Sequence, residues 1–163
     1  MVDIQTVSIA IASAGVFLAA IYYILQLRHQ AKMRQTDLVM RLYSIYGSPE
    51  FQEASMKASL LELTDYSDLV KKYPAVENRI TVMRDFHSTA TFFEGIGVLL
   101  HRKLISIDLV DDLLSTPIIY TWDRFGPFVK SMRESLKRPQ IWEWFEYLYN
   151  EMQKREQQLA KAK

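Results

Sequence analysis

The sequence contains no cysteine, which excludes disulfide bonds, thiolate zinc sites and cysteine nucleophiles. It has three histidines, His29, His87 and His101, and none of them follows a glutamate by three positions. The Glu-x-x-His pairs of carboxylate-bridged di-metal bundles are therefore missing, as are the helical zinc-protease motif, the nucleophile elbow and the phosphate-binding glycine loop. We therefore expect no enzymatic activity, no catalytic or metal-binding residues and no cofactor.

The chain also lacks an excess of charge of one sign. It carries 20 Lys and Arg against 19 Asp and Glu, and all but one of these side chains lie after residue 27. A nucleic-acid-binding domain usually shows a clear basic excess. We therefore expect no nucleic-acid partner.

Residues 4–27 form a stretch of 24 residues without a charged side chain. As a helix this stretch would span about 36 Å, slightly more than a hydrocarbon core of about 30 Å. The alternative is a cleaved signal peptide, which has a basic start and an apolar run of about 7–15 residues. Here the short tail of residues 1–3 carries Asp3 instead, and the run is longer. The sequence predicts a retained transmembrane helix.

The flanks of this span predict its orientation. Arg28, Lys32 and Arg34 follow it closely, and Lys and Arg are enriched on the cytoplasmic side of membrane spans. We expect a single-pass protein of the cell membrane, with its N-terminus outside and its C-terminal domain in the cytoplasm. The three basic residues are typical of a stop-transfer flank facing lipid headgroups, whereas a switch that binds anionic lipid needs more charges.

Four small residues of the span, Ser8, Ala12, Gly15 and Ala19, recur at intervals of four, three and four. This spacing places them on one narrow stripe of a helix, where another helix could approach closely. The alternative is that small residues are simply common in membrane spans. The stripe is a candidate packing face for a second copy or another membrane protein.

Proline and glycine divide the rest of the chain into helices, and no segment alternates as a strand would. The anchor is expected to continue as a juxtamembrane helix over residues 28–46 and to stop at Gly47. Ser48 with Pro49 then predicts a helix start, and Asp65 or Ser67 a short helix that ends before Pro74. These helices open a domain over residues 47–153, followed by a charged tail at 154–163. The expected fold is all-α, with one N-terminal transmembrane helix continuing into a compact multi-helix cytoplasmic bundle.

The longest helix of this domain is expected over residues 75–101. Its core-facing residues recur at threes and fours: Ile80, Met83, Phe86, Ala90, Phe93, Gly97 and Leu100. Gly95 and Gly97 reduce helix propensity but would let a neighbouring helix approach closely. A short helix at 107–114, another that opens at Thr116-Pro117 and kinks at Gly126-Pro127, and a last one from Pro139 are expected to follow.

Three segments in this order behind an anchor resemble one family: FFEGIGVLL at 92–100, LISIDLV at 104–110 and WEWFEYLY at 142–149. The family consists of small prokaryotic membrane-anchored helical proteins and is catalogued as a domain of unknown function. The resemblance covers about residues 30–150 and implies a helical cytoplasmic domain behind a single span. Lys103 stands where members often have Gly. The resemblance implies no catalytic residues.

The clearest polar constellation is His87, Thr91, Glu94 and His101, whose spacings of four, three and seven place them along one stripe. Glu94 lies in an otherwise apolar stretch, and a buried carboxylate must be paired. Arg41 and Arg124 are the candidate partners in a buried ion pair that fixes the helix register. The alternative is a ligand-binding or proton-transfer site around Glu94.

The segment from Trp142 to Tyr149 is rich in aromatic residues. Trp142, Phe145 and Tyr149 share one face and are expected in the core. Trp144 and Tyr147 point elsewhere, so they form either a partner surface or a cover for a second neighbouring helix.

Together these features favour a membrane-tethered, non-enzymatic interaction module that contacts membrane lipid. It would form a homo-oligomer or serve as an accessory subunit of a complex with another membrane protein. The alternative is a membrane-anchored sensor or small-ligand-binding domain with a pocket near Glu94.

Overall fold

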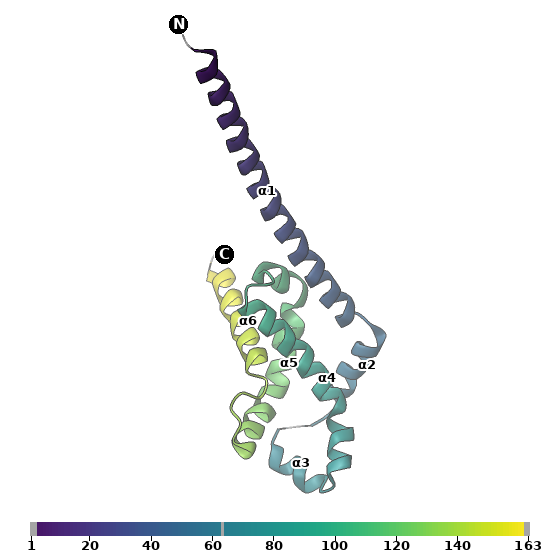
Figure 1. The fold of residues 1–163 in the computed structure, drawn as a ribbon. Coiled ribbons are helices and arrows are strands. Elements are labelled where there is room, and N and C mark those ends of the chain that lie inside the picture. The colour runs from purple at the N-terminus through teal and green to yellow at the C-terminus, as the bar shows by residue number, and fades with distance from the viewer. Residues whose placement is uncertain (1–2, 63, 162–163) are drawn as a thin grey trace. The chain divides into compact units, whose positions relative to one another are not determined.

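The computed structural model describes residues 3–62 and 64–161, the side chains of residues 6 and 10 excepted. The described residues form helices and no strand (Figure 1). The helices are α1 (Ile4–Tyr46), α2 (Pro49–Ser59), α3 (Tyr66–Lys72), α4 (Val76–His101), α5 (Ile107–Leu136) and α6 (Glu143–Lys161). The all-α prediction is confirmed. Of the tails predicted at 1–3 and 154–163, residues 1, 2, 162 and 163 lie outside the described residues.

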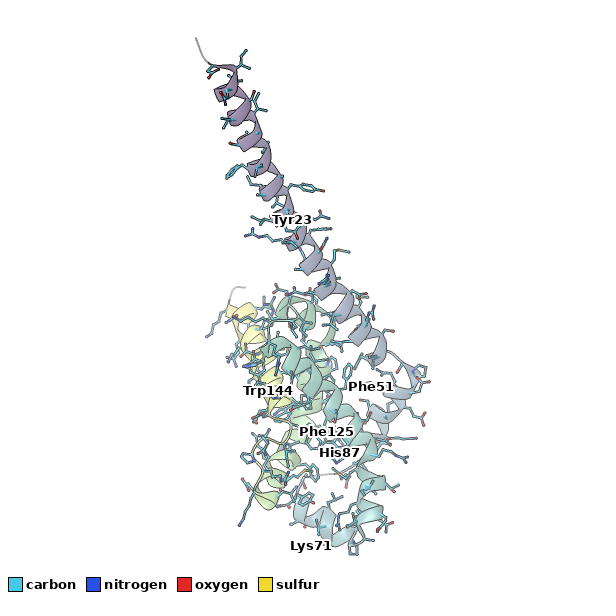
Figure 2. The ribbon with its side chains drawn as sticks, in the orientation of Figure 1. Tyr23, Phe51, Lys71, His87, Phe125 and Trp144 are labelled. Atoms are coloured by element: carbon cyan, nitrogen blue, oxygen red, sulfur yellow. The ribbon has the colours of Figure 1, made fainter. Side chains whose placement is uncertain are left out.

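The chain divides into two compact units, Met1–Leu38 and Val39–Lys163. The first unit is the greater part of α1, which contains a stretch long and apolar enough to cross a membrane, with a mean hydropathy of 2.1. Its large side chains are exposed; Phe17, for example, is 67% exposed and Tyr23 is 63% exposed. Figure 2 marks Tyr23 among the side chains that extend from this helix. The described part of this unit is therefore an apolar helix with an exposed surface.

In the second unit, side-chain caps fix where α2 and α3 begin. Ser48 caps α2 by accepting a hydrogen bond from the Phe51 amide at 3.2 Å, with Pro49 in the first position as predicted. Asp65 caps α3 by accepting a hydrogen bond from the Ser67 amide at 2.6 Å. Local sequence therefore determines these two helix starts.

Aromatic side chains form much of the core of the second unit. The ring of Phe86 on α4 meets Phe125 and Phe128 of α5 at centroid distances of 4.8 and 5.4 Å. Further along α4, Phe93 stacks on Phe145 of α6 at 5.0 Å. The predicted core stripe of α4 is buried except at Ile80, which is 64% exposed. The prediction was wrong there because α4 has a hollow beside Ile80 rather than a packed helix.

The region 107–136 differs from the prediction, because α5 is one continuous helix with Pro117 and Pro127 inside it. A proline in a helix interior removes a hydrogen bond and costs about 3 kcal/mol. Leu114, Ile118 and Trp122 are all buried on one face that crosses the first proline. Burial of this continuous face offsets the lost hydrogen bond, so no new helix begins at Thr116-Pro117.

The last helix also starts later than predicted. It begins at Glu143 rather than at Pro139, and residues 139–142 form turns. Lys137 and Trp142 at the two ends of this connection have left-handed backbones, with φ of 53° and 49°. The helix then continues through Lys161, where the sequence predicted a charged tail. Arg155 in that segment bonds the carboxylates of Asp108 and Asp111 of α5, at 2.5 and 2.6 Å.

Candidate functional site along α4 and the start of α6

Helices α4 and α6 lie side by side (Figure 1). They approach each other closely at Gly97. A Cβ at Gly97 would lie 2.0 Å from the carbonyl oxygen of Trp144 and 2.6 Å from its carbonyl carbon. A Cβ at Gly95 would meet nothing within 4 Å. The predicted close approach is therefore made at Gly97 and not at Gly95.

Glu94 lies three residues before this contact and is half-buried. Its Oε2 accepts a hydrogen bond from the backbone N–H of Phe145 at 2.7 Å. Burial raises the pKa of the Glu94 carboxyl, and hydrogen bonds from the Phe145 and Trp144 backbones act in the opposite direction. The carboxylate therefore serves the first turn of α6, whose amides have no partner within their own helix.

The structure corrects one of the two ion pairs expected of Glu94, the one with Arg124. The guanidinium of Arg124 donates instead to the carbonyl oxygen of Leu61, at 3.5 Å. The pairing with Arg41 stays a prediction. Sequence spacing could not reveal this acceptor role of Glu94, because the donor amide of Phe145 lies 51 positions further along the chain.

The C-terminal end of the predicted stripe is an aromatic cluster. The ring centroid of His101 lies 4.3 Å from that of Trp144 and 5.4 Å from that of Tyr147. Both aromatic rings are only half-exposed, and burial raises the pKa of Tyr147. Trp144 and Tyr147 therefore cover the neighbouring helix α4, one of the two alternatives that the sequence left open.

At the other end of the stripe, His87 lies against Trp142, with 5.0 Å between ring centroids. The imidazole keeps an exposed edge, yet partial burial lowers its pKa, so the ring is neutral at pH 7. Thr91, between His87 and Glu94, is exposed. The predicted stripe thus runs along the start of α6, but its four members have different surroundings and do not converge on one site.

Beside His87 the surface is hollowed, with a volume of about 390 Å³. The walls come from α3, α4, α5 and the turn before α6, and they are mostly apolar. Met83 and Trp142 belong to this lining, as do His87 and Arg79, whereas Glu94 does not. This hollow lies two turns away from Glu94, next to His87, and the pocket expected near Glu94 stays a prediction.

Arg133 holds the turn that forms one wall of this hollow. Its Nε donates to the carbonyl of Ile141 at 2.8 Å, its Nη2 donates to the carbonyl of Trp142 at 3.2 Å, and its Nη1 pairs with Glu146. The arginine is 14% exposed in its side chain. Sequence reasoning missed Arg133 because its partners lie in an irregular turn whose backbone no periodicity describes.

The segments of α1 named from the sequence are exposed. Ser8, Ala12, Gly15 and Ala19 all lie on the open surface of the helix, and the Ser8 hydroxyl donates back to the Ile4 carbonyl at 2.9 Å. The basic flank of Arg28, Lys32 and Arg34 is exposed as well. These surfaces are open to a partner or to lipid.

An all-α domain behind a helix long and apolar enough to cross a membrane is the class of protein that this fold defines. The chain belongs to the family described as a domain of unknown function (DUF4760), whose model matches residues 9–152. The resemblance to an uncharacterised family is thereby confirmed, while the prokaryotic origin and the membrane anchoring stay expectations. No curated protein and no solved structure matches the chain.

Proposed function

We propose that this protein is a membrane-tethered, non-enzymatic helical interaction module. In this proposal α1 crosses the cell membrane once, with the N-terminus outside and the helical domain in the cytoplasm. The protein then assembles with further copies of itself or joins a membrane complex as an accessory subunit. The observation that carries the proposal is the exposed apolar surface of α1.

Water is an unfavourable surrounding for this surface. Val16, Phe17 and Leu18 are 71%, 67% and 66% exposed. Apolar surface left in water costs about 25 cal/mol per Å², so a helix of this kind is stable only when lipid or another helix covers it. The exposed basic flank at Arg28, Lys32 and Arg34 supports an orientation with the following domain inside.

Orientation is tested with two reporters fused in turn to the C-terminus of the full chain. A reporter that is active only in the cytoplasm should give signal, and one that is active only outside should be silent. The reverse pattern would place the domain outside.

Assembly is tested on the stripe of small residues. Ala12 and Ala20 are both exposed alanines of α1, and at 100° per residue Ala20 lies about 110° from the centre of the stripe. In an intramembrane association assay, Ala12→Leu should weaken association, and Ala20→Leu should not, although the chemical change is the same. Gly15→Leu should act like Ala12→Leu, because a Cβ at Gly15 has nothing within 4 Å and the space is open to a partner. If all three variants associate as strongly as the wild type does, the stripe is not the packing face.

A second candidate function, a sensor or small-ligand-binding domain, is supported by the hollow beside His87. Its volume of about 390 Å³ lies within the range of about 300–1,000 Å³ typical of ligand pockets. An apolar lining with a few polar groups is also typical of such sites. Saturable binding of a small molecule that a substitution in the lining abolishes would test this function.

A further inference from the structure

The hollow beside His87 has mostly apolar walls, but its lining also carries a positive charge. Among its lining residues, Arg79 carries a positive charge, and the neutral His87 offers an N–H donor. In the part of the chain that the structure describes, no Asp or Glu belongs to this lining. A positive charge over an apolar wall, without a carboxylate to neutralise it, favours an anionic ligand.

Arg79 is fixed in place at the rim. Its Nη1 donates to the carbonyl oxygens of Tyr73 and Pro74, both at 2.7 Å. A guanidinium has five N–H donors, so the group retains donors on Nε and Nη2 after these two bonds. A carboxylate is the acceptor that matches this geometry best, because it can take two parallel N–H bonds. His87 adds an N–H donor in either protonation state.

Another wall of the hollow, at Trp142, is held by several contacts. Trp142 has a left-handed backbone with φ of 49°, a conformation that costs a bulky residue about 1–2 kcal/mol. Arg133 donates a hydrogen bond to the carbonyl oxygen of Trp142. The Trp142 ring meets Phe86 edge-on at a centroid distance of 5.1 Å and His87 at 5.0 Å. Strain of this kind persists only where the surroundings enforce it, and it is found preferentially at binding sites. A preformed aromatic wall reduces the entropy lost when a flat apolar ligand binds.

We infer that this hollow binds a small organic acid, whose carboxylate meets Arg79 and His87 and whose aromatic or aliphatic body packs on Met83 and Trp142. This inference rests on the second candidate function and specifies its ligand class. It does not depend on how the protein assembles in the membrane.

The test uses the full chain in neutral phosphatidylcholine nanodiscs and three probes that share one ring system: 1-naphthylacetate, 1-naphthylacetamide and 1-naphthylmethylammonium. Titration calorimetry, corrected with empty nanodiscs, should show saturable binding of the carboxylate at one site per chain. The neutral amide should bind more weakly, and the ammonium should bind least.

Variants at an exposed position of the rim then locate the site. Ile80 belongs to the lining and is 64% exposed, so a charge there should not prevent folding. Ile80→Glu should weaken carboxylate binding about tenfold, because a second carboxylate repels the ligand and competes for Arg79. Ile80→Lys should bind the carboxylate as tightly as wild type or more tightly. Leu60→Glu, at a residue that is 79% exposed and outside this lining, should leave binding unchanged.

Two results would overturn the inference in distinguishable ways. In the first, the ammonium or the amide binds at least as tightly as the carboxylate, and the two Ile80 variants bind the carboxylate with similar affinity; the hollow then binds ligands without a preference for anions. If none of the three probes gives saturable heat, both the organic-acid site and the ligand-binding function fail.

Discussion

The contact at Gly97 yields the sharpest stability prediction. A Cβ at this position would lie 2.0 Å from the Trp144 carbonyl oxygen, whereas ordinary contacts of a Cβ begin at 3.4 Å. Gly97→Ala therefore forces α4 and the start of α6 apart by more than 1 Å, and backbone atoms cannot rotate away as a side chain could. Overpacking of this kind costs about 1–3 kcal/mol, occasionally more.

Gly95 is the matched control on the same helix. A Cβ at Gly95 meets nothing within 4 Å, so Gly95→Ala should gain about 0.5–1 kcal/mol of helix propensity. The same gain applies to Gly97→Ala, but the clash with backbone atoms places its cost at the upper end of the range, about 3 kcal/mol, for a net loss of about 2 kcal/mol. The two identical substitutions, two positions apart, should thus change stability in opposite directions.

Thermal unfolding followed by tryptophan fluorescence measures this difference in the full chain. All three tryptophans, Trp122, Trp142 and Trp144, lie in the second unit, so the signal reports that unit and not the exposed part of α1. At about 4 °C per kcal/mol for a domain of this size, Gly97→Ala should melt about 8 °C below wild type, and Gly95→Ala slightly above it. A Gly97→Ala protein that melts with wild type would refute the close approach of α4 and α6.

Three further predictions concern the same region. Glu94→Ala should cost about 1 kcal/mol, because it removes a hydrogen bond to the α6 amides, whereas breaking a buried ion pair would cost about 3–5 kcal/mol. Since the folded pKa of Glu94 is raised, the wild type should lose stability relative to Glu94→Gln as the pH rises from below 4.5 through that pKa. Urea unfolding at several pH values measures this loss. Lys103→Gly should gain about 1 kcal/mol in urea unfolding because φ at Lys103 is 57°, and Lys103→Val should lose stability; equal midpoints for the two would refute the left-handed turn. Arg133→Met should lower the free energy of unfolding by about 2–3 kcal/mol and Glu146→Gln by clearly less, because the arginine also binds the carbonyls of Ile141 and Trp142. Equal losses would mean that Arg133 acts through its ion pair with Glu146 alone.

Local signals account for the parts of the fold that were predictable. The caps at Ser48 and Asp65 depend on residues two or three positions away, and the stripe of α4 depends on its own period. The continuity of α5 through Pro117 was not predictable in this way. It depends on burial of Ile118 and Trp122 against other helices, a free energy that the local sequence does not contain.

The candidate site was predictable in its residues but not in their roles. Glu94 is a polar residue in an apolar run, which correctly marked it as partly buried. Its partner is a backbone amide, however, and amides carry no signature in a sequence. Trp142 was correctly expected in the core, yet its left-handed backbone arises from the turn between α5 and α6 and from Arg133. Such non-local constraints become visible only in the structure.

The start of α6 explains why one stripe of α4 has two kinds of surroundings. From Glu94 onward, α6 lies against α4, and the polar residues of the stripe bond its first turn or pack on its aromatic rings. Beside His87, α6 has not yet begun, and the turn that ends at Trp142 leaves a hollow where a packed helix would otherwise lie. The positions Glu94 and His101 are therefore committed to holding two helices together, whereas His87 keeps an exposed edge beside a fixed aromatic wall. A substitution at Glu94 should thus act mainly on stability, and one at His87 mainly on what the hollow binds.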